Sequence, residues 1–221
     1  MNWVVALPFG HRLPSGSATA QATQKREAGL VEEDVDLMLR VKVGDAQAFN
    51  QLMDKYQRTV VNLVFRFTGD AENAEDLAQE VFLRVYRAAP RYEPKAKFFT
   101  YLYQITLNLC RNERERNQRR RTSSLDSRAG DDRSWDVPDP EAGAETQLQR
   151  QETASQVQAA IQELPNEQRQ LLILQRFQEL GYEELAEVTA QTVSAVKAKL
   201  HRARLALKKK LKPLLGKEPT L

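Results

Sequence analysis

The stretch YEELAEVTAQTVSAVKAKLHRARLALKKK, residues 182–210, predicts two helices joined by a tight turn. We expect the first helix over residues 182–188 and the second over about 193–211. Thr192 lies between them and offers a hydroxyl that can cap the second helix. A short helix, a turn and a longer helix are typical of a helix-turn-helix. The second helix carries its apolar side chains in one stripe: Val193, Val196, Leu200, Ala203 and Leu207.

Charge is divided between these two helices. The acids Glu183, Glu184 and Glu187 all fall in the first helix, and no acid follows them up to Lys210. Small residues let a helix approach the floor of a DNA major groove, while Lys and Arg reach bases and phosphates. A solvated basic helix is the alternative interpretation, but the separation of the acids favours DNA binding. Outside the apolar stripe of the second helix, small residues alternate with basic ones: Ser194, Ala195, Lys197, Ala198, Lys199 and Arg202.

Composition narrows the class of protein. The chain has 221 residues and a net charge of +3 although 29% of its residues are charged, so the charge must lie in patches. Cys110 is the single cysteine and is expected to be buried, which excludes an internal disulfide. His11 and His201 are far apart, so the sequence predicts no metal site and no cofactor. The N-terminal apolar run is too short to cross a bilayer, and we expect a soluble, cytoplasmic protein.

Apolar residues recur at helical spacing through most of the chain. In the first half they predict two helices broken at Gly44, a third helix from near Ala71 that ends before Pro90, and a fourth over about residues 98–117. In the second half, Pro165 suits the start of a helix. We therefore expect an all-α protein with five parts: a disordered N-terminal tail (1–30), a first helical domain (31–117), a flexible acidic linker (118–150), a second helical domain (151–215) and a C-terminal tail (216–221).

The stretch NAEDLAQEVFLRVYRAA, residues 73–89, has two faces. Its apolar side is expected to be core. An acidic, amide-bearing face beside a leucine suits a basic partner helix, although a solvated acidic face is the alternative. That second face gathers its residues at i, i+3 and i+4 spacing: Glu75, Asp76, Gln79, Glu80, Leu83 and Arg84.

Residues 90–121 interleave aromatic and basic side chains. Aromatic faces beside cations are suited to stacking and holding single-stranded bases. Some of the rings must belong to the core. The aromatic residues are Tyr92, Phe98, Phe99, Tyr101 and Tyr103, with Lys95, Lys97 and a run of arginines from Arg111 to Arg121 around them.

Together the three stretches resemble bacterial sigma factors of the extracytoplasmic-function (ECF) group, which contain only sigma regions two and four. Residues 73–87 resemble region 2.2, residues 98–108 resemble region 2.3 running into 2.4, and residues 182–204 resemble region 4.2. The resemblance spans about residues 31–212. It implies a sigma region-two domain followed by a linker and a sigma region-four helix-turn-helix domain.

The resemblance also implies a function. The chain would be a non-catalytic subunit that binds core RNA polymerase, through its clamp helices and flap, and directs it to promoters. It would contact double-stranded and single-stranded promoter DNA, and an anti-sigma factor is a further expected partner. No membrane insertion is expected. Tyr101 stands where the family usually has Trp, which keeps a smaller stacking face.

Residue roles carry over to matching positions. Polymerase binding is implied for Asp76, Gln79, Glu80, Leu83 and Arg84. Minus-ten DNA binding is implied for Arg91, Tyr92, Lys95, Lys97, Phe98, Tyr101, Asn108, Arg111 and Arg114. Minus-thirty-five DNA binding is implied for Thr192, Ser194, Ala195, Lys197, Ala198, Lys199, Arg202 and Arg204.

Two other classes of protein remain as alternatives. A helix-turn-helix regulator would pair the DNA-binding domain with an N-terminal sensing domain and would form a symmetric dimer. A nucleic-acid-processing enzyme would need clustered carboxylates or a nucleophile with its base, and the sequence offers neither cluster.

Overall fold

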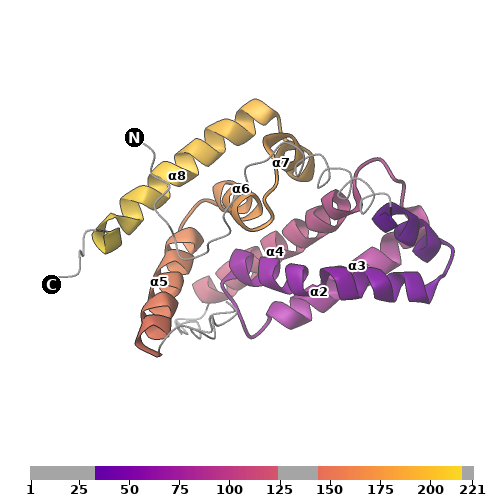
Figure 1. The fold of residues 1–221 in the computed structure, drawn as a ribbon, viewed down its shortest axis with the longest axis horizontal. Coiled ribbons are helices and arrows are strands. Elements are labelled where there is room, and N and C mark those ends of the chain that lie inside the picture. The colour runs from indigo at the N-terminus through magenta and orange to yellow at the C-terminus, as the bar shows by residue number, and fades with distance from the viewer. Residues whose placement is uncertain (1–32, 124–143, 216–221) are drawn as a thin grey trace.

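The computed structural model describes residues 33–123 and 144–215, and all regular elements within them are helical. No helix in these ranges is long and apolar enough to cross a membrane. The expected tails and the middle of the expected linker lie outside the described residues. A helix at residues 33–42 precedes α2 (Ala46–Thr68), α3 (Ala74–Ala88), a 3-10 turn (Ala89–Arg91), α4 (Phe98–Ser123), α5 (Ala144–Gln162), α6 (Asn166–Phe177), α7 (Tyr182–Thr189) and α8 (Val193–Leu215) (Figure 1).

The helix at residues 33–42 and helices α2, α3 and α4 form the first domain, and local sequence signals set where they begin and end. Asp45 caps α2, because its carboxylate accepts hydrogen bonds from the amides of Gln47 and Ala48 at 2.9 and 3.1 Å. Gly69 ends α2 with a φ of +73°, a left-handed conformation that favours glycine. The predicted break at Gly44 is confirmed, and there φ is +95°.

The apolar stripes of these helices meet in one core. Its largest fully buried members in this domain are Met38, Leu52, Leu63, Leu102 and Phe98. The Phe98 ring packs edge-on against Tyr56 with 5.4 Å between ring centroids. The first domain is thus a rigid helical support for the residues on its surface.

Helices α5 to α8 form the second domain, in which α8 packs on α6 and α7. Leu171, Leu185 and Leu200 are completely buried between them. Arg169 is also buried, at 3% exposure, and its guanidinium donates to the carbonyl oxygens of Ile161, Gln162 and Leu164. This side chain fixes the turn between α5 and α6, because it donates to carbonyls at the end of α5 and in the turn that follows.

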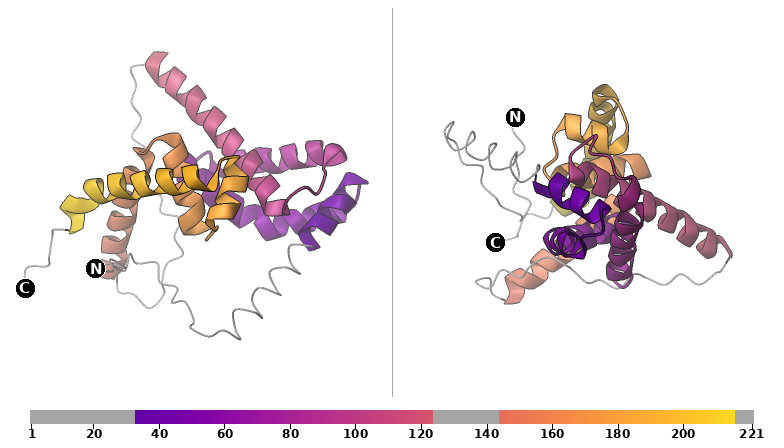
Figure 2. Two further views of the ribbon diagram at one scale, coloured as in Figure 1. Left: turned by 90° about the horizontal axis from the view of Figure 1, so that it is seen from above. Right: turned by 90° about the vertical axis from the view of Figure 1, so that its right-hand side faces the viewer.

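Two helices are longer than the sequence analysis predicted. Helix α4 continues past Asn117 to Ser123, and α5 begins at Ala144 instead of near residue 151. The α4 extension, QRRRTS, is rich in Arg, and the α5 extension, AETQLQR, consists mainly of Ala, Glu, Gln, Leu and Arg. These residues are good helix formers, so helical propensity continues both helices beyond the apolar pattern. The end of α4 projects away from the other helices (Figure 2).

The two domains lie against each other, which the sequence analysis did not predict. Helix α2 contacts α5 and α6, and α4 contacts α7. The Arg169 guanidinium also donates to the carbonyl of Phe67 in the first domain at 3.4 Å. The amide of Gln162 donates to the carbonyl of Arg66 at 2.7 Å.

Candidate functional site

The acidic face predicted on α3 is exposed and continuous. Asp76 and Gln79 are exposed, and the Leu83 side chain is 47% exposed beside them. Glu80 accepts a hydrogen bond from Arg84 at 2.9 Å. The structure therefore brings the five predicted polymerase-binding residues together on one surface, apart from the core side of the helix.

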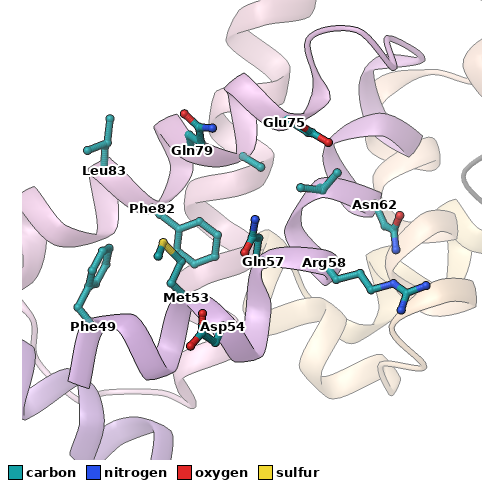
Figure 3. A pocket seen from close by; sticks show the side chains of 12 residues that line it. Phe49, Met53, Asp54, Gln57, Arg58, Asn62, Glu75, Gln79, Phe82 and Leu83 are labelled. Carbon is teal, nitrogen blue, oxygen red and sulfur yellow. The ribbon is translucent and has the colours of Figure 1, made fainter. Parts of the chain in front are cut away.

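A groove of about 630 Å³ runs between α3 and α2 beside this face. Its floor is apolar and its rim carries charges and amides, so it suits an amphipathic helix. The side chains from the two helices face each other across it (Figure 3). It is lined by Phe49, Met53, Asp54, Gln57, Arg58, Val61 and Asn62 of α2 and by Glu75, Ala78, Gln79, Phe82 and Leu83 of α3.

The α2 side of the groove was missed by the sequence analysis, which treated α2 only as a core helix. Asp54, Gln57 and Arg58 are polar residues three and four positions apart, next to the half-buried Met53. That spacing was the available signal. It becomes informative only when α3 is seen to lie alongside.

The predicted minus-ten residues divide into exposed and buried groups. Arg91, Lys95, Lys97, Asn108 and Arg111 are exposed, whereas Arg114 is half-buried and donates to Gln162 of the second domain at 2.7 Å. Tyr92 is 3% exposed and Phe98 1% exposed, so both are core residues in this structure. Of the three predicted rings Tyr92, Phe98 and Tyr101, only Tyr101 reaches the surface.

Tyr101 is held in place by the two buried rings. Its ring centroid lies 5.2 Å from that of Tyr92 and 6.4 Å from that of Phe98. Burial raises the pKa of the Tyr101 hydroxyl above its usual value. The arrangement holds the half-buried Tyr101 ring against two buried rings, and the Lys97 ammonium lies over the neighbouring Phe99 ring, 5.4 Å from its centroid.

The predicted helix-turn-helix is confirmed. Ala190 takes the left-handed conformation after α7 with a φ of +52°, and the Thr192 hydroxyl accepts a hydrogen bond from the Ala195 amide at 3.2 Å. Val196, Leu200 and Ala203 are buried against the domain.

The opposite face of α8 carries the predicted minus-thirty-five residues. Thr192, Ser194, Lys197, Ala198, Arg202 and Arg204 are exposed, and Ala195 is half-buried. Arg204, although exposed, donates to the Gln175 side chain of α6 at 2.7 Å, and Lys199 is half-buried. Its ammonium lies 2.6 Å from the Glu167 carboxylate and 2.6 Å from the Gln191 amide oxygen, which draw it toward the protein.

No group of three or more His, Cys, Asp or Glu residues within 33–123 and 144–215 could hold a metal ion. Cys110 is buried, as expected, and burial raises the pKa of its thiol to about 12. A thiol with that pKa is a poor nucleophile at neutral pH.

Comparison with protein families agrees with this arrangement of two domains. Residues 52–120 match the family model Sigma-70 region 2, and residues 154–207 match the family model Sigma-70, region 4. The chain is 36% identical over 190 residues to the RNA polymerase sigma-H factor of Pseudomonas aeruginosa, covering 83% of this chain and 96% of that protein. It is 32% identical over 184 residues to the ECF RNA polymerase sigma-E factor of Escherichia coli, covering 82% and 96%.

Solved structures with low sequence identity share the fold. CnrH in complex with the cytosolic domain of CnrY has a TM-score of 0.60 at 20% identity, covering 82% of this chain and 98% of that chain. The sigma factor RpoE in complex with the anti-sigma factor NepR from Bartonella quintana has a TM-score of 0.60 at 18% identity, covering 76% and 98%.

Proposed function

Because the chain belongs to the extracytoplasmic-function group of sigma factors, we propose that it binds core RNA polymerase and directs promoter-specific initiation of transcription. One observation supports this function most directly. A match to sigma region two precedes a match to sigma region four, and the alignment with the sigma-H factor covers 96% of that relative's length. A sensing domain, as in the alternative helix-turn-helix regulator, would not match sigma region two.

The proposal assigns the exposed face of α3 and the adjoining groove to the polymerase clamp helices. The face combines carboxylates, an amide and the exposed Leu83. Such a surface fits an amphipathic helix with basic residues on its flanks. The flap is the expected polymerase contact of the second domain.

Promoter recognition is assigned to α4 and α8. Lys97, Tyr101, Asn108 and Arg111 offer cations, an aromatic edge and an amide along α4, which suits opened minus-ten DNA. The exposed face of α8 has small residues among Lys and Arg and suits the major groove of the minus-thirty-five element.

The proposed role is non-catalytic and cytoplasmic, since the chain would supply sequence recognition while the polymerase supplies the chemistry. An anti-sigma factor is included as a proposed regulator, because the fold is shared with RpoE in its complex with NepR.

Two measurements test the proposed function. Purified chain mixed with core RNA polymerase should co-elute with it on size exclusion. The resulting holoenzyme should give run-off transcripts from promoters of this chain's own genome that core polymerase alone does not use. A chain that fails to co-elute, or that forms a palindrome-binding dimer instead, would support the regulator class.

A further inference from the structure

Lys197, a residue of the proposed minus-thirty-five surface, lies over an aromatic ring. Its ammonium is 5.2 Å from the centroid of the Tyr182 ring. Tyr182 is the first residue of α7 and Lys197 belongs to α8, so the contact joins the two helices of the helix-turn-helix. An ammonium within about 6 Å of a ring centroid is attracted by the ring quadrupole. The ring therefore draws the Lys197 side chain toward one position before DNA binds.

Both ends of this contact are anchored. Glu184 accepts a hydrogen bond from the Gly181 amide at 3.1 Å, which fixes the start of α7 directly before Tyr182. The half-buried Tyr182 ring packs against the apolar core. On α8, Val196 is completely buried and precedes the exposed Lys197. The ring and the base of the lysine side chain thus lie on well-packed backbone.

Lys199, further along α8, is held in a different way. Its ammonium lies 2.6 Å from the Glu167 carboxylate and 2.6 Å from the Gln191 amide oxygen. The carboxylate offsets the positive charge, and both partners occupy N–H donors of the ammonium. Lys199 therefore ties α8 to α6, which contains Glu167, with its charge already paired.

Lys197 keeps its charge and its donors. Among the residues that the structure describes, it has no carboxylate partner. In two other lysine–ring contacts the ammonium also pairs with an acid, Lys55 with Asp34 and Lys97 with Glu184. A ring face orients an ammonium without accepting a conventional hydrogen bond, so the N–H donors of Lys197 stay available for base edges and phosphates.

Resting on the proposed function, we infer that Tyr182 is a positioning residue for recognition of the minus-thirty-five element. Its ring holds the Lys197 ammonium at the exposed face of α8 and leaves the charge unpaired. Ordering a long, flexible side chain at an interface costs free energy, and a preformed position reduces that cost. Tyr182 thus acts on DNA binding through Lys197.

A double-mutant cycle in the holoenzyme tests this role. The probe is a labelled duplex from a promoter that gives run-off transcripts, cut so that it carries the minus-thirty-five element and ends before the minus-ten element. Tyr182→Leu keeps an apolar side chain against the core but removes the ring, and it should weaken binding about 2- to 5-fold. Tyr182→Phe keeps the ring and should retain the wild-type affinity. In a Lys197→Met background, Tyr182→Leu should have no further effect, because no ammonium remains to be positioned.

A second readout is made on the free full chain. In NMR spectra the ε-methylene protons of Lys197 should be shifted upfield by the ring, and the shift should disappear in Tyr182→Leu but persist in Tyr182→Phe. An unshifted Lys197 signal in the wild type would overturn the inference. So would an equal loss of affinity from Tyr182→Leu with and without Lys197, because the ring would then act through the fold alone. Run-off transcription by the wild-type holoenzyme tests the proposed function separately, so a chain that initiates while the cycle is additive would lose this inference alone.

Discussion

The guanidinium of Arg66 lies over the ring of Phe177, 3.6 Å from its centroid. Arg66 belongs to the last turn of α2 in the first domain, and Phe177 is the last residue of α6 in the second. A cation over an aromatic face is attracted by the negative electrostatic potential of that face, which arises from the ring quadrupole, and shielding from water strengthens the attraction. This pair therefore joins two domains whose sequences are separated by a long linker.

A double-mutant cycle on this pair should reveal coupling between the domains. Phe177→Leu keeps apolar volume but removes the aromatic face, and Arg66→Met keeps the stem but removes the charge. We expect a coupling free energy of about 0.5–2 kcal/mol in urea unfolding of the full chain. Strictly additive effects would mean that the stacked geometry contributes nothing to stability.

Replacing Arg169 should destabilise the second domain. The substitution Arg169→Met leaves the carbonyls of Ile161, Gln162, Leu164 and Phe67 without this donor. We expect a loss of about 1.5–3 kcal/mol in the free energy of unfolding, measured by urea denaturation. Arg176→Met, an exposed arginine on the same helix, is the matched control and should change stability by no more than about 0.5 kcal/mol.

Changes on the α3 face should weaken polymerase binding without unfolding the protein. Asp76→Arg reverses a charge and Gln79→Ala removes an amide, both at exposed positions outside the core. Each should raise the dissociation constant for core polymerase at least about fivefold if it lies near the centre of the interface. Glu72→Arg makes the same charge reversal at an exposed residue before α3 begins, and its binding should match the wild type. If all three variants bind core polymerase with unchanged affinity, the docking surface lies elsewhere on the protein.

Substitutions on α8 should separate base reading from phosphate contact. Arg202 is exposed in the first half of the helix, whereas Lys209 is exposed further along. Arg202→Ala should lose about 1–3 kcal/mol of binding free energy at some promoters, and it should therefore change the rank order of transcription among the promoters. Lys209→Ala should lower transcription from all promoters by a similar factor, and it should reduce the salt dependence of DNA binding. Run-off transcription on a set of minus-thirty-five variants measures both. If Arg202→Ala also lowers transcription from every promoter by the same factor, α8 attracts DNA by charge and does not read its sequence.

The Cys110 thiol should resist modification until the protein unfolds. Burial raises its pKa from 9.0 to about 12, so the folded state disfavours the thiolate. The stabilising contribution is present below pH 9 and is lost as the pH rises toward 12, because the unfolded chain ionises first. At pH 8, Ellman's reagent should react with the denatured chain far faster than with the native one. Equal rates would show that the first domain opens readily around α4.

Several features followed from local sequence. The break at Gly44, the cap at Thr192 and the buried stripe of α8 were all predicted correctly, because turn chemistry and helical periodicity act between residues that are close in the chain. The exposed α3 face was likewise predicted, since i, i+3 and i+4 spacing places its residues together whatever surrounds the helix. The full lengths of α4 and α5 were not predicted, because helical propensity continues these two helices beyond the end of the apolar pattern.

The sequence by itself determined two helical domains, their order and the faces available for recognition. Only the tertiary structure decided which faces meet: that α2 completes a groove with α3, that Tyr92 and Phe98 lie beneath Tyr101, and that acidic α7 lies on α4. The physical reason is distance along the chain. Lys97 and Glu184 are 87 residues apart, and no local pattern specifies such a pair, because its free energy depends on how both domains pack.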